Sequence, residues 1–329
     1  MRFLDFEKPV AELEVKIAEL RELSNTQGVN ITSEISKLEA KAQKLLKKLY
    51  DDLTPWQKVL VARHEDRPQF LDYVDEMCPD LEFLAGDRLA AEDRALLGGI
   101  GHFNRKPVMV IGQQKGNSTE TRLKHNFGMA RPEGYRKAKR LIELADKFAL
   151  PIVTFINTSG AYPGVDSEEH GQSEAIASCT LACIKARVPI VSVIIGEGGS
   201  GGAIAIATAN HVIMLEHSFY SVISPEGCAS ILWKTAKANA QAAVEQKLTA
   251  GDLFKFGVID EIIQEPVGGA HRNKKRTISS VLEQIEEQLG NMTSRENDDL
   301  RVEREERFLK FGEKLTPRQK FEEYANPTR

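Results

Sequence analysis

The apolar positions of the first fifty residues recur at the spacing of an α-helix. Two such runs stand on either side of the break TQGVN at residues 26–30. The first run contains Val10, Leu13, Ile17 and Leu20, and the second contains Ile31, Ile35, Leu38, Ala42, Leu45 and Leu49. Two amphipathic helices joined in this way predict a helical hairpin over 1–53, an arm whose apolar stripe needs a partner surface to cover it.

Between residues 54 and 290, runs of strand length alternate with runs of helical spacing. We expect helices over 56–62, 70–77, 133–148, 172–186, 229–246 and 250–256, and strands over 95–102, 107–112, 151–158, 189–195, 211–216 and 258–264. The first two strands form a hairpin around Asn104. This alternation predicts an α/β core with mostly parallel strands over 54–290.

The last part of the chain, 291–329, is charged at nearly every second position from Ser294 onward and has little apolar periodicity. We expect a solvated helix or a mobile tail there.

Composition limits the class of protein. The 329 residues carry 44 Lys and Arg against 48 Asp and Glu, a net charge of -4, so nothing attracts nucleic acid or an anionic membrane globally. We find no apolar run long enough to span a membrane and no secretory signal, and we therefore expect a cytoplasmic protein. The four cysteines form no C-x-x-C pair, which favours buried thiols and no metal site in this chain.

The most informative segment is 188–216, where an apolar strand runs into GEGGSGG at residues 196–202. Glycines bring backbone N–H groups within reach of a ligand, and the apolar helix that follows adds the positive end of its dipole. The segment therefore predicts an anion receptor. The segment also matches the G-x-G-x-x-G fingerprint of dinucleotide-binding units, at Gly196, Gly198 and Gly201, with Glu216 about 20 residues further on. That fingerprint belongs with the first strand of its domain, whereas at least two strand and helix units precede this segment. A glycine-rich turn without a ligand is the third reading.

A second irregular loop, INTSGAYPGVDSEEHGQSEAIA, follows the strand 151–158. Ligands of α/β proteins collect at the carboxyl ends of strands, so two such loops predict one pocket. Ser159 lacks the G-x-S-x-G context of a hydrolase nucleophile, and Ser200 is the stronger nucleophile candidate. For both serines we favour a role in the turn.

Several motifs resemble one known family. They are NFGM (126–129), PEGYRKA (132–138), TSGAYPG (158–164), GQSEAIA (171–177), GEGGSGGA (196–203), SVISPEGCASILWK (221–234) and GGAHRN (268–273). Together they resemble the alpha subunit of the bacterial and plastid acetyl-CoA carboxylase carboxyltransferase. The resemblance covers nearly the whole chain and fades after about Asn291. One departure is Ser159, where many members of the family have proline.

The resemblance implies a crotonase-like superhelix of β-β-α units and a transfer of CO2 from carboxybiotin to acetyl-CoA, which gives malonyl-CoA for fatty-acid synthesis. It implies an α2β2 heterotetramer with a beta subunit, a separate biotin carboxyl carrier protein and biotin carboxylase. No biotin is attached to this chain, and zinc is expected only in the beta subunit. By resemblance, the backbone N–H groups of Gly201, Gly202 and Ala203 form the oxyanion hole on the biotin side.

We also expect residues of the neighbouring turns to bind substrate. These are Gly160, Ala161, Gly198 and Gly199 in the two loops, and Ser224, Pro225, Glu226 and Gly227 in SPEG, although Pro225 and Gly227 are also ordinary turn formers. A run of basic residues consists of Lys115, Arg122, Lys124, Arg131, Arg136 and Lys137. It could bind CoA phosphates or the carrier protein, or it could be a solvated basic face. The rival functions are a stand-alone crotonase-type hydratase or hydrolase and a non-catalytic scaffold subunit.

Overall fold

The computed structural model describes residues 2–27, 31–293, 295 and 297–311. Its helices are η1 Asp5–Glu7, α1 Lys8–Gln27, α2 Thr32–Asp51, α3 Pro55–Ala62, α4 Phe70–Met77, α5 Thr119–Lys124, η2 Asn126–Gly128, α6 Pro132–Lys147, α7 Val165–Glu169, α8 Gln172–Lys185, α9 Ser200–Ala207, α10 Pro225–Trp233, η3 Ala236–Ala238, α11 Asn239–Glu245, α12 Ala250–Lys255, η4 Ala270–Arg272, α13 Lys274–Thr293 and α14 Asn297–Leu309. Its strands are β1 Glu82–Phe83, β2 Leu96–Phe103, β3 Lys106–Gln113, β4 Ile152–Thr158, β5 Ile190–Gly199, β6 His211–Leu215, β7 Phe219–Ser221 and β8 Glu261–Ile263.

The strands form one mixed sheet in the order β1-β2-β3-β4-β5-β6-β8, with β7 paired to β5. β1, β2 and β3 are antiparallel, whereas β3 through β6, β7 and β8 pair in parallel. The predicted hairpin around Asn104 and the mostly parallel α/β core are therefore confirmed. In a parallel sheet, β4 and β5 end at the same edge, which brings the two predicted loops together.

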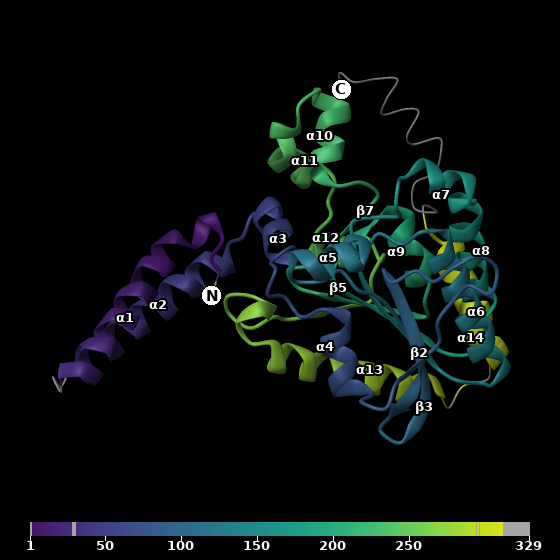
Figure 1. Ribbon diagram of the computed structural model, residues 1–329, viewed down its shortest axis with the longest axis horizontal. Coiled ribbons are helices and arrows are strands. Elements are labelled where there is room, and N and C mark those ends of the chain that lie inside the picture. The colour runs from purple at the N-terminus through teal and green to yellow at the C-terminus, as the bar shows by residue number, and fades with distance from the viewer. Residues whose placement is uncertain (1, 28–30, 294, 296, 312–329) are drawn as a thin grey trace.

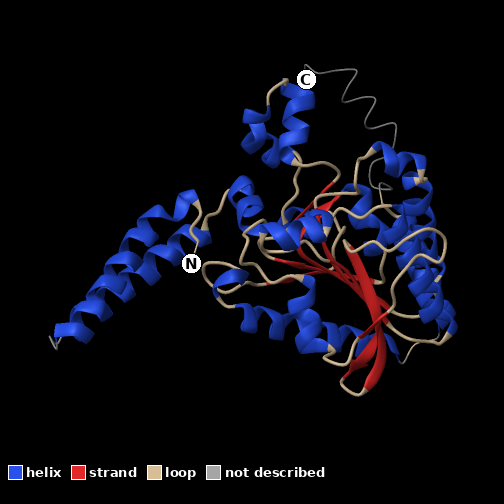
Figure 2. Ribbon diagram, in the orientation of Figure 1, coloured by secondary structure: helices blue, strands red, loops and turns tan. Residues whose placement is uncertain are grey.

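The sheet has helices on both of its faces (Figure 2). Alternate residues of the central strands face one or the other of these helical layers. Ile152 and Ile190 point into a core shared with α6, α8 and α9, whereas Val153 and Val191 point into a core shared with α4 and α13. A sheet buried on both faces explains why these strands are almost continuously apolar.

The N-terminal helices α1 and α2 pack against each other and project from the body as an arm (Figure 1). Its root is fixed by an apolar cluster of Val10, Leu46, Tyr50 and Val61. The predicted helical hairpin is confirmed. The proposed boundary of the arm at residue 53 stays a prediction.

Three element predictions differ from the structure. The strand expected over 258–264 is limited to β8, Glu261–Ile263. The single helix expected over 229–246 is divided into α10, η3 and α11, because Lys234 takes a left-handed conformation with φ 57° at the end of α10. The strand expected over 189–195 continues through the glycines to Gly199, so the predicted glycine loop is the end of β5 and the start of α9.

The expectation of a solvated or mobile C-terminus is wrong for α14. Leu300 and Arg304 are fully buried there. The Arg304 guanidinium donates to the carbonyl oxygens of Cys183 at 2.6 Å and Val188 at 2.8 Å, at the C-terminal end of α8 and beyond. Charge patterning alone does not reveal this, because a buried arginine and a solvated one look alike in a sequence. Residues 294, 296 and 312–329 lie outside the described residues.

Within the described parts of the chain, no helix has the length and apolar character needed to cross a membrane.

Candidate active site

The junction between β5 and α9 leaves a helix N-terminus open. Gly199 is the N-cap residue in an extended conformation, and no side chain caps α9 within the described chain. The first N–H groups of a helix have no partner inside the helix, so those of Ser200, Gly201 and Gly202 are available to a ligand. No acidic residue lies in this first turn, so the positive end of the helix dipole is not neutralised locally.

The loop after β4 lies directly against this junction. A Cβ placed on Gly202 would come within 2.7 Å of the Ala161 nitrogen and 3.0 Å of the Tyr135 hydroxyl. A Cβ on Gly199 would collide with the backbone of Ser159. These two positions therefore require glycine because two backbones approach closely. The two loops therefore lie against each other, and the prediction that they form one pocket stays a prediction.

The loop after β4 is held in a tight turn that its own residues form. Gly160 has φ 143°, in the region that favours glycine, and its N–H donates to Thr158 Oγ1 at 3.0 Å. The same hydroxyl donates to the Gly160 carbonyl at 2.8 Å. Within the described residues, the N–H of Ala161 has no hydrogen-bond partner. Ala161 therefore contributes a further free donor beside the α9 turn.

Gly201 differs from its neighbour. A Cβ there would meet only the Ile176 side chain, at 3.5 Å. Ser200 and Gly201 border an apolar cavity of about 440 Å³ whose other walls include Tyr220, Phe308 and Phe311. A side chain at Gly202 would thus point at the loop after β4, while one at Gly201 would have room. The open side of the α9 turn is the side of Gly201.

Gln113 at the end of β3 ties the two loops together and was missed by the sequence analysis. It is fully buried, its Nε2 donates to the Gly202 carbonyl at 2.7 Å, and its Oε1 accepts from the Asn157 N–H at 3.0 Å. A buried glutamine satisfied at both ends fixes the relative position of α9 and β4. The only feature of the sequence that indicated a role for Gln113 was its position as a polar residue at the end of an apolar strand.

The second predicted turn, SPEG, begins α10 and is closed by its own residues. Ser224 is the N-cap and its hydroxyl accepts from the Gly227 N–H at 3.1 Å, while Pro225 occupies the first turn, where no N–H is needed. Glu226 pairs with Arg63 at 2.6 Å. The role of these residues as turn formers is visible. Substrate binding by them stays a prediction.

Glu197 carries the buried charge of the glycine segment. Its side chain is 3% exposed and accepts from Arg63 at 2.7 Å and from Lys115. Burial alone would raise the pKa of Glu197, but the neighbouring Lys115 and Arg63 outweigh it and hold that pKa below its usual value. The carboxylate is therefore ionised at neutral pH.

Comparison with known proteins identifies the family. A model described as "Acetyl co-enzyme A carboxylase carboxyltransferase-like" matches residues 3–312. A protein of Paramagnetospirillum magneticum named acetyl-coenzyme A carboxylase carboxyl transferase subunit alpha is 56% identical over 312 residues, which cover 95% of this chain and 98% of that protein. A protein of the same name from Zymomonas mobilis is 55% identical over 310 residues, with 94% and 99% covered.

The chain belongs to the acetyl-CoA carboxylase carboxyltransferase family. The family match extends past Asn291, where the sequence resemblance was expected to fade, and includes all of α14. The packing of Arg304 agrees with this, since α14 is part of the folded body.

Solved structures confirm the crotonase-like carboxyltransferase fold. A transcarboxylase 12S structure aligns with a TM-score of 0.57 and 17% identity over 71% of this chain and 43% of that one. A Pseudomonas malonate decarboxylase heterotetramer in complex with coenzyme A aligns with a TM-score of 0.56 and 14% identity over 70% and 90%. At such identities the likeness shows the fold of this carboxyltransferase family member and no more.

Most members of the basic run have ion pairs within the chain. The pairs are Lys115 with Glu197, Arg122 with Glu65, Arg131 with Asp166, Arg136 with Asp87 and Lys137 with Glu92. In particular, the side chain of Lys137 is 1% exposed. Binding of CoA phosphates or of the carrier protein by this run stays a prediction.

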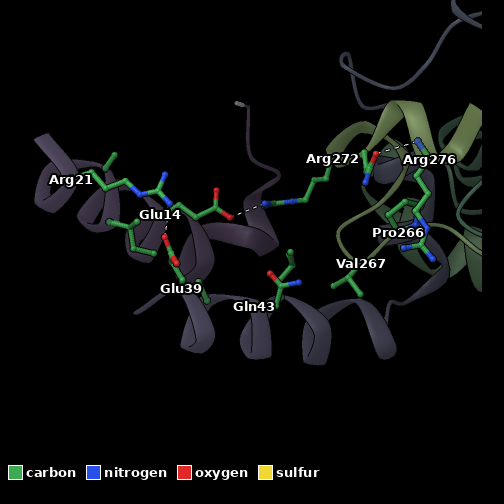
Figure 3. A pocket seen from close by; sticks show the side chains of 13 residues that line it. Glu14, Arg21, Glu39, Gln43, Pro266, Val267, Arg272 and Arg276 are labelled. Atoms are coloured by element: carbon green, nitrogen blue, oxygen red, sulfur yellow. Dashed lines mark hydrogen bonds and ion pairs between the residues drawn. The ribbon is translucent and has the colours of Figure 1, made fainter. Parts of the chain in front are cut away.

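A groove of about 930 Å³ lies between the arm and the body (Figure 3). Arg272 reaches Glu14 across it at 2.7 Å, and Arg21 pairs with Glu39 between the two arm helices at 2.5 Å. None of the predicted site residues lines it. The groove therefore lies apart from every residue of the predicted site.

The cysteines offer no metal site. Cys78, Cys179 and Cys183 are buried and free, and Cys228 is free and half-buried. No group of three metal-binding side chains occurs among the described residues.

Proposed function

We infer that this chain is the alpha subunit of an acetyl-CoA carboxylase carboxyltransferase. It transfers the carboxyl group of carboxybiotin to acetyl-CoA and forms malonyl-CoA, the first committed step of fatty-acid synthesis. The observation that carries this is the match of the family over residues 3–312, with relatives aligned along nearly their full length.

The open N-terminus of α9 supplies the biotin side of the reaction in this proposal. Release of CO2 leaves negative charge on the ureido oxygen of biotin, and fixed N–H donors at a helix N-terminus stabilise such charge. Gly201 and Gly202 are the proposed donors with Ala203 next to them, and the free N–H of Ala161 stands beside them. Gly160, Ala161, Gly198 and Gly199 of the two loops and Ser224, Pro225, Glu226 and Gly227 of SPEG are proposed to bind substrate. Among them, Gly199 lets the backbone of β5 approach that of Ser159.

If the anion left on biotin accepted the proton of the acetyl-CoA methyl group, the reaction would need no base from this chain, and the deprotonated carbon would bond to the released CO2. Proton loss places negative charge on the thioester oxygen, and a second set of donors must stabilise it. We assign those donors to the beta subunit of an α2β2 heterotetramer, which also holds the zinc. Carboxybiotin arrives on a separate biotin carboxyl carrier protein after its carboxylation by biotin carboxylase.

The test is an assay of malonyl-CoA formation by the purified chain alone and after mixing with a carboxyltransferase beta subunit. We expect negligible turnover alone, because one of the two oxyanion sites is missing, and robust turnover in the mixture. Robust malonyl-CoA formation by this chain without a partner would refute the claim that one oxyanion site is missing. Hydration or hydrolysis of an acyl-CoA by the chain alone would favour the stand-alone hydratase or hydrolase class instead. An inactive mixture with correct assembly favours a scaffold.

A further inference from the structure

Glu197 is the one charged side chain in GEGGSGG, and the oxyanion proposal gives it no task. It stands two residues before Gly199, the N-cap of α9, and pairs in the sheet with Phe219 of β7. Its neighbours must be small, because a Cβ on Gly196 would come within 2.7 Å of Asn157 Oδ1 and one on Gly198 within 3.0 Å of Tyr220. A charge buried in such a strand needs a reason.

Stability alone does not explain why a charged network stands here, although removing one member would leave the others without their partner. Removing a carboxylate from water costs several kcal/mol, and its ion pairs roughly balance this cost, so replacing a buried pair with uncharged groups is often neutral. A neutral side chain of the same shape would keep the β5–β7 pairing. We therefore look for the role of the Glu197 carboxylate in the side chains that it orients.

The partners of Glu197 come from separate segments and extend to the second helix N-terminus. Arg63, the C-cap residue of α3, donates to Glu197 Oε1 through Nε at 3.0 Å and Nη2 at 2.7 Å. Its remaining Nη1 donates to Glu226 Oε1 in the first turn of α10 at 2.6 Å. Lys115, from the loop after β3, neutralises the other oxygen of Glu197. The guanidinium also lies over the Phe219 ring, 5.3 Å from its centroid.

One planar group thus links the strand end that begins α9 to the turn that begins α10. The link matters because α10 and α11 stand apart from the sheet in Figure 1, and α11 contacts the body mainly through α3. Arginine suits this task, since its fork can hold two carboxylates in fixed directions, which a lysine cannot do.

We propose that Glu197 is a positioning residue for carboxyl transfer, which acts through Arg63 to set the SPEG turn of α10 relative to the amide donors of α9. The inference rests on the proposed function. Its substance is a coupling between Glu197 and Glu226, two carboxylates that share Arg63.

The experiment compares Glu197→Gln, Glu226→Gln and the double variant in the complete complex with the beta subunit. Misplacing a site by about 1 Å costs up to roughly 100-fold. We expect Glu197→Gln to lower kcat roughly 10-fold to 100-fold with KM for acetyl-CoA nearly unchanged. The double variant should be no slower than Glu197→Gln, because the bridge is already broken.

Hydrogen exchange of peptides covering 196–203 and 221–228 gives a readout independent of turnover. We expect faster exchange in both peptides for Glu197→Gln. Arg63→Lys, which keeps the charge but loses the fork, should reproduce the kinetic effect and serves if Glu197→Gln does not fold. Asp260→Asn is the matched control: it breaks an ion pair with Arg307 of 2.5 Å at the opposite edge of the sheet and should leave kcat unchanged.

Parental turnover separates the two claims. An assembled parent complex without malonyl-CoA formation refutes the proposed function itself. An active parent whose Glu197→Gln variant keeps full kcat, or whose two single effects multiply in the double variant, refutes the positioning role and leaves the function standing.

Discussion

Two helices begin near each other in this molecule, and their N-termini are built in opposite ways. α10 has a serine cap, a proline in the first turn and an acidic residue, Glu226, at its positive end. α9 has a glycine at the cap position, no side-chain cap and no acidic residue in its first turn. The first helix satisfies its own donors, whereas the second leaves them for something else. The difference indicates which of the two predicted turns receives an anion.

The largest effect is expected from a side chain placed where α9 approaches the loop after β4. Gly202→Val should lower carboxyl transfer by roughly 100-fold or more, because its side chain would force apart Gly202 and Ala161 and misalign a donor. The added side chain would act on the loop after β4 and not by a direct clash with biotin, since the Cβ points at that loop. Steady-state assays of the assembled complex measure it, and binding of acetyl-CoA should change little.

Two variants control this experiment. Gly201→Ala should be nearly harmless, because its Cβ meets only Ile176 at 3.5 Å. Ser200→Ala should cause a modest loss, whereas a nucleophilic serine would make that variant inactive. A folded but inactive Ser200→Ala complex, or a Gly202→Val complex as active as its parent, would show that the role given to this turn is wrong.

A second experiment makes α9 resemble α10. Gly201→Asp adds a carboxylate to the first turn of α9, where there is room for it. The helix should gain roughly 0.3–1 kcal/mol of stability from its dipole. The same charge repels the developing oxyanion, and a repulsion of a few kcal/mol at an effective dielectric constant of about 20 lowers turnover roughly 10-fold to 100-fold. Thermal unfolding and kinetics should therefore move in opposite directions.

Gly201→Asn is the neutral control for this change. It has nearly the same shape and should keep most of the turnover. Equal losses for Asp and Asn would mean that bulk, and not charge, disturbs the turn.

The sequence predicted the features that depend on neighbouring residues in the chain. It did not predict the roles of residues whose partners lie far away in the sequence. Apolar alternation identified β4 and β5, and glycine content identified the open turn of α9. Gln113 and Arg304 could not be assigned, because their partners, Gly202 and Val188, lie 89 and 116 residues away. Whether a polar side chain is buried depends on tertiary packing, which periodicity does not report. The break at Lys234 was missed for another reason, since a left-handed lysine has no sequence signal.

A smaller effect is expected at the capped N-terminus of α10. Ser224→Ala removes the cap that accepts from the Gly227 N–H at 3.1 Å and should cost about 1 kcal/mol of stability, which chemical denaturation would detect. Turnover at saturating substrate should fall less than for Gly201→Asp, since the α10 cap holds its own helix and no oxyanion. A loss as large as that of Gly202→Val would instead place SPEG in the reaction.

The smallest effect concerns pH and the carboxylate that joins the two helices. Although burial would raise the pKa of Glu197, Lys115 and Arg63 lower it below the ordinary value of 4.5. A carboxylate whose pKa is depressed in the folded state contributes stability above its unfolded pKa, and this contribution disappears as the pH falls through the folded pKa. We therefore expect the contribution of Glu197 to the free energy of unfolding to be constant through the neutral range and to vanish only in acid, below pH 4.5. The test compares the free energy of unfolding of the parent and of Glu197→Gln at several pH values. If the difference between the two proteins already shrinks near neutral pH, Glu197 takes up a proton there. A protonated Glu197 could not hold Arg63 between α9 and α10.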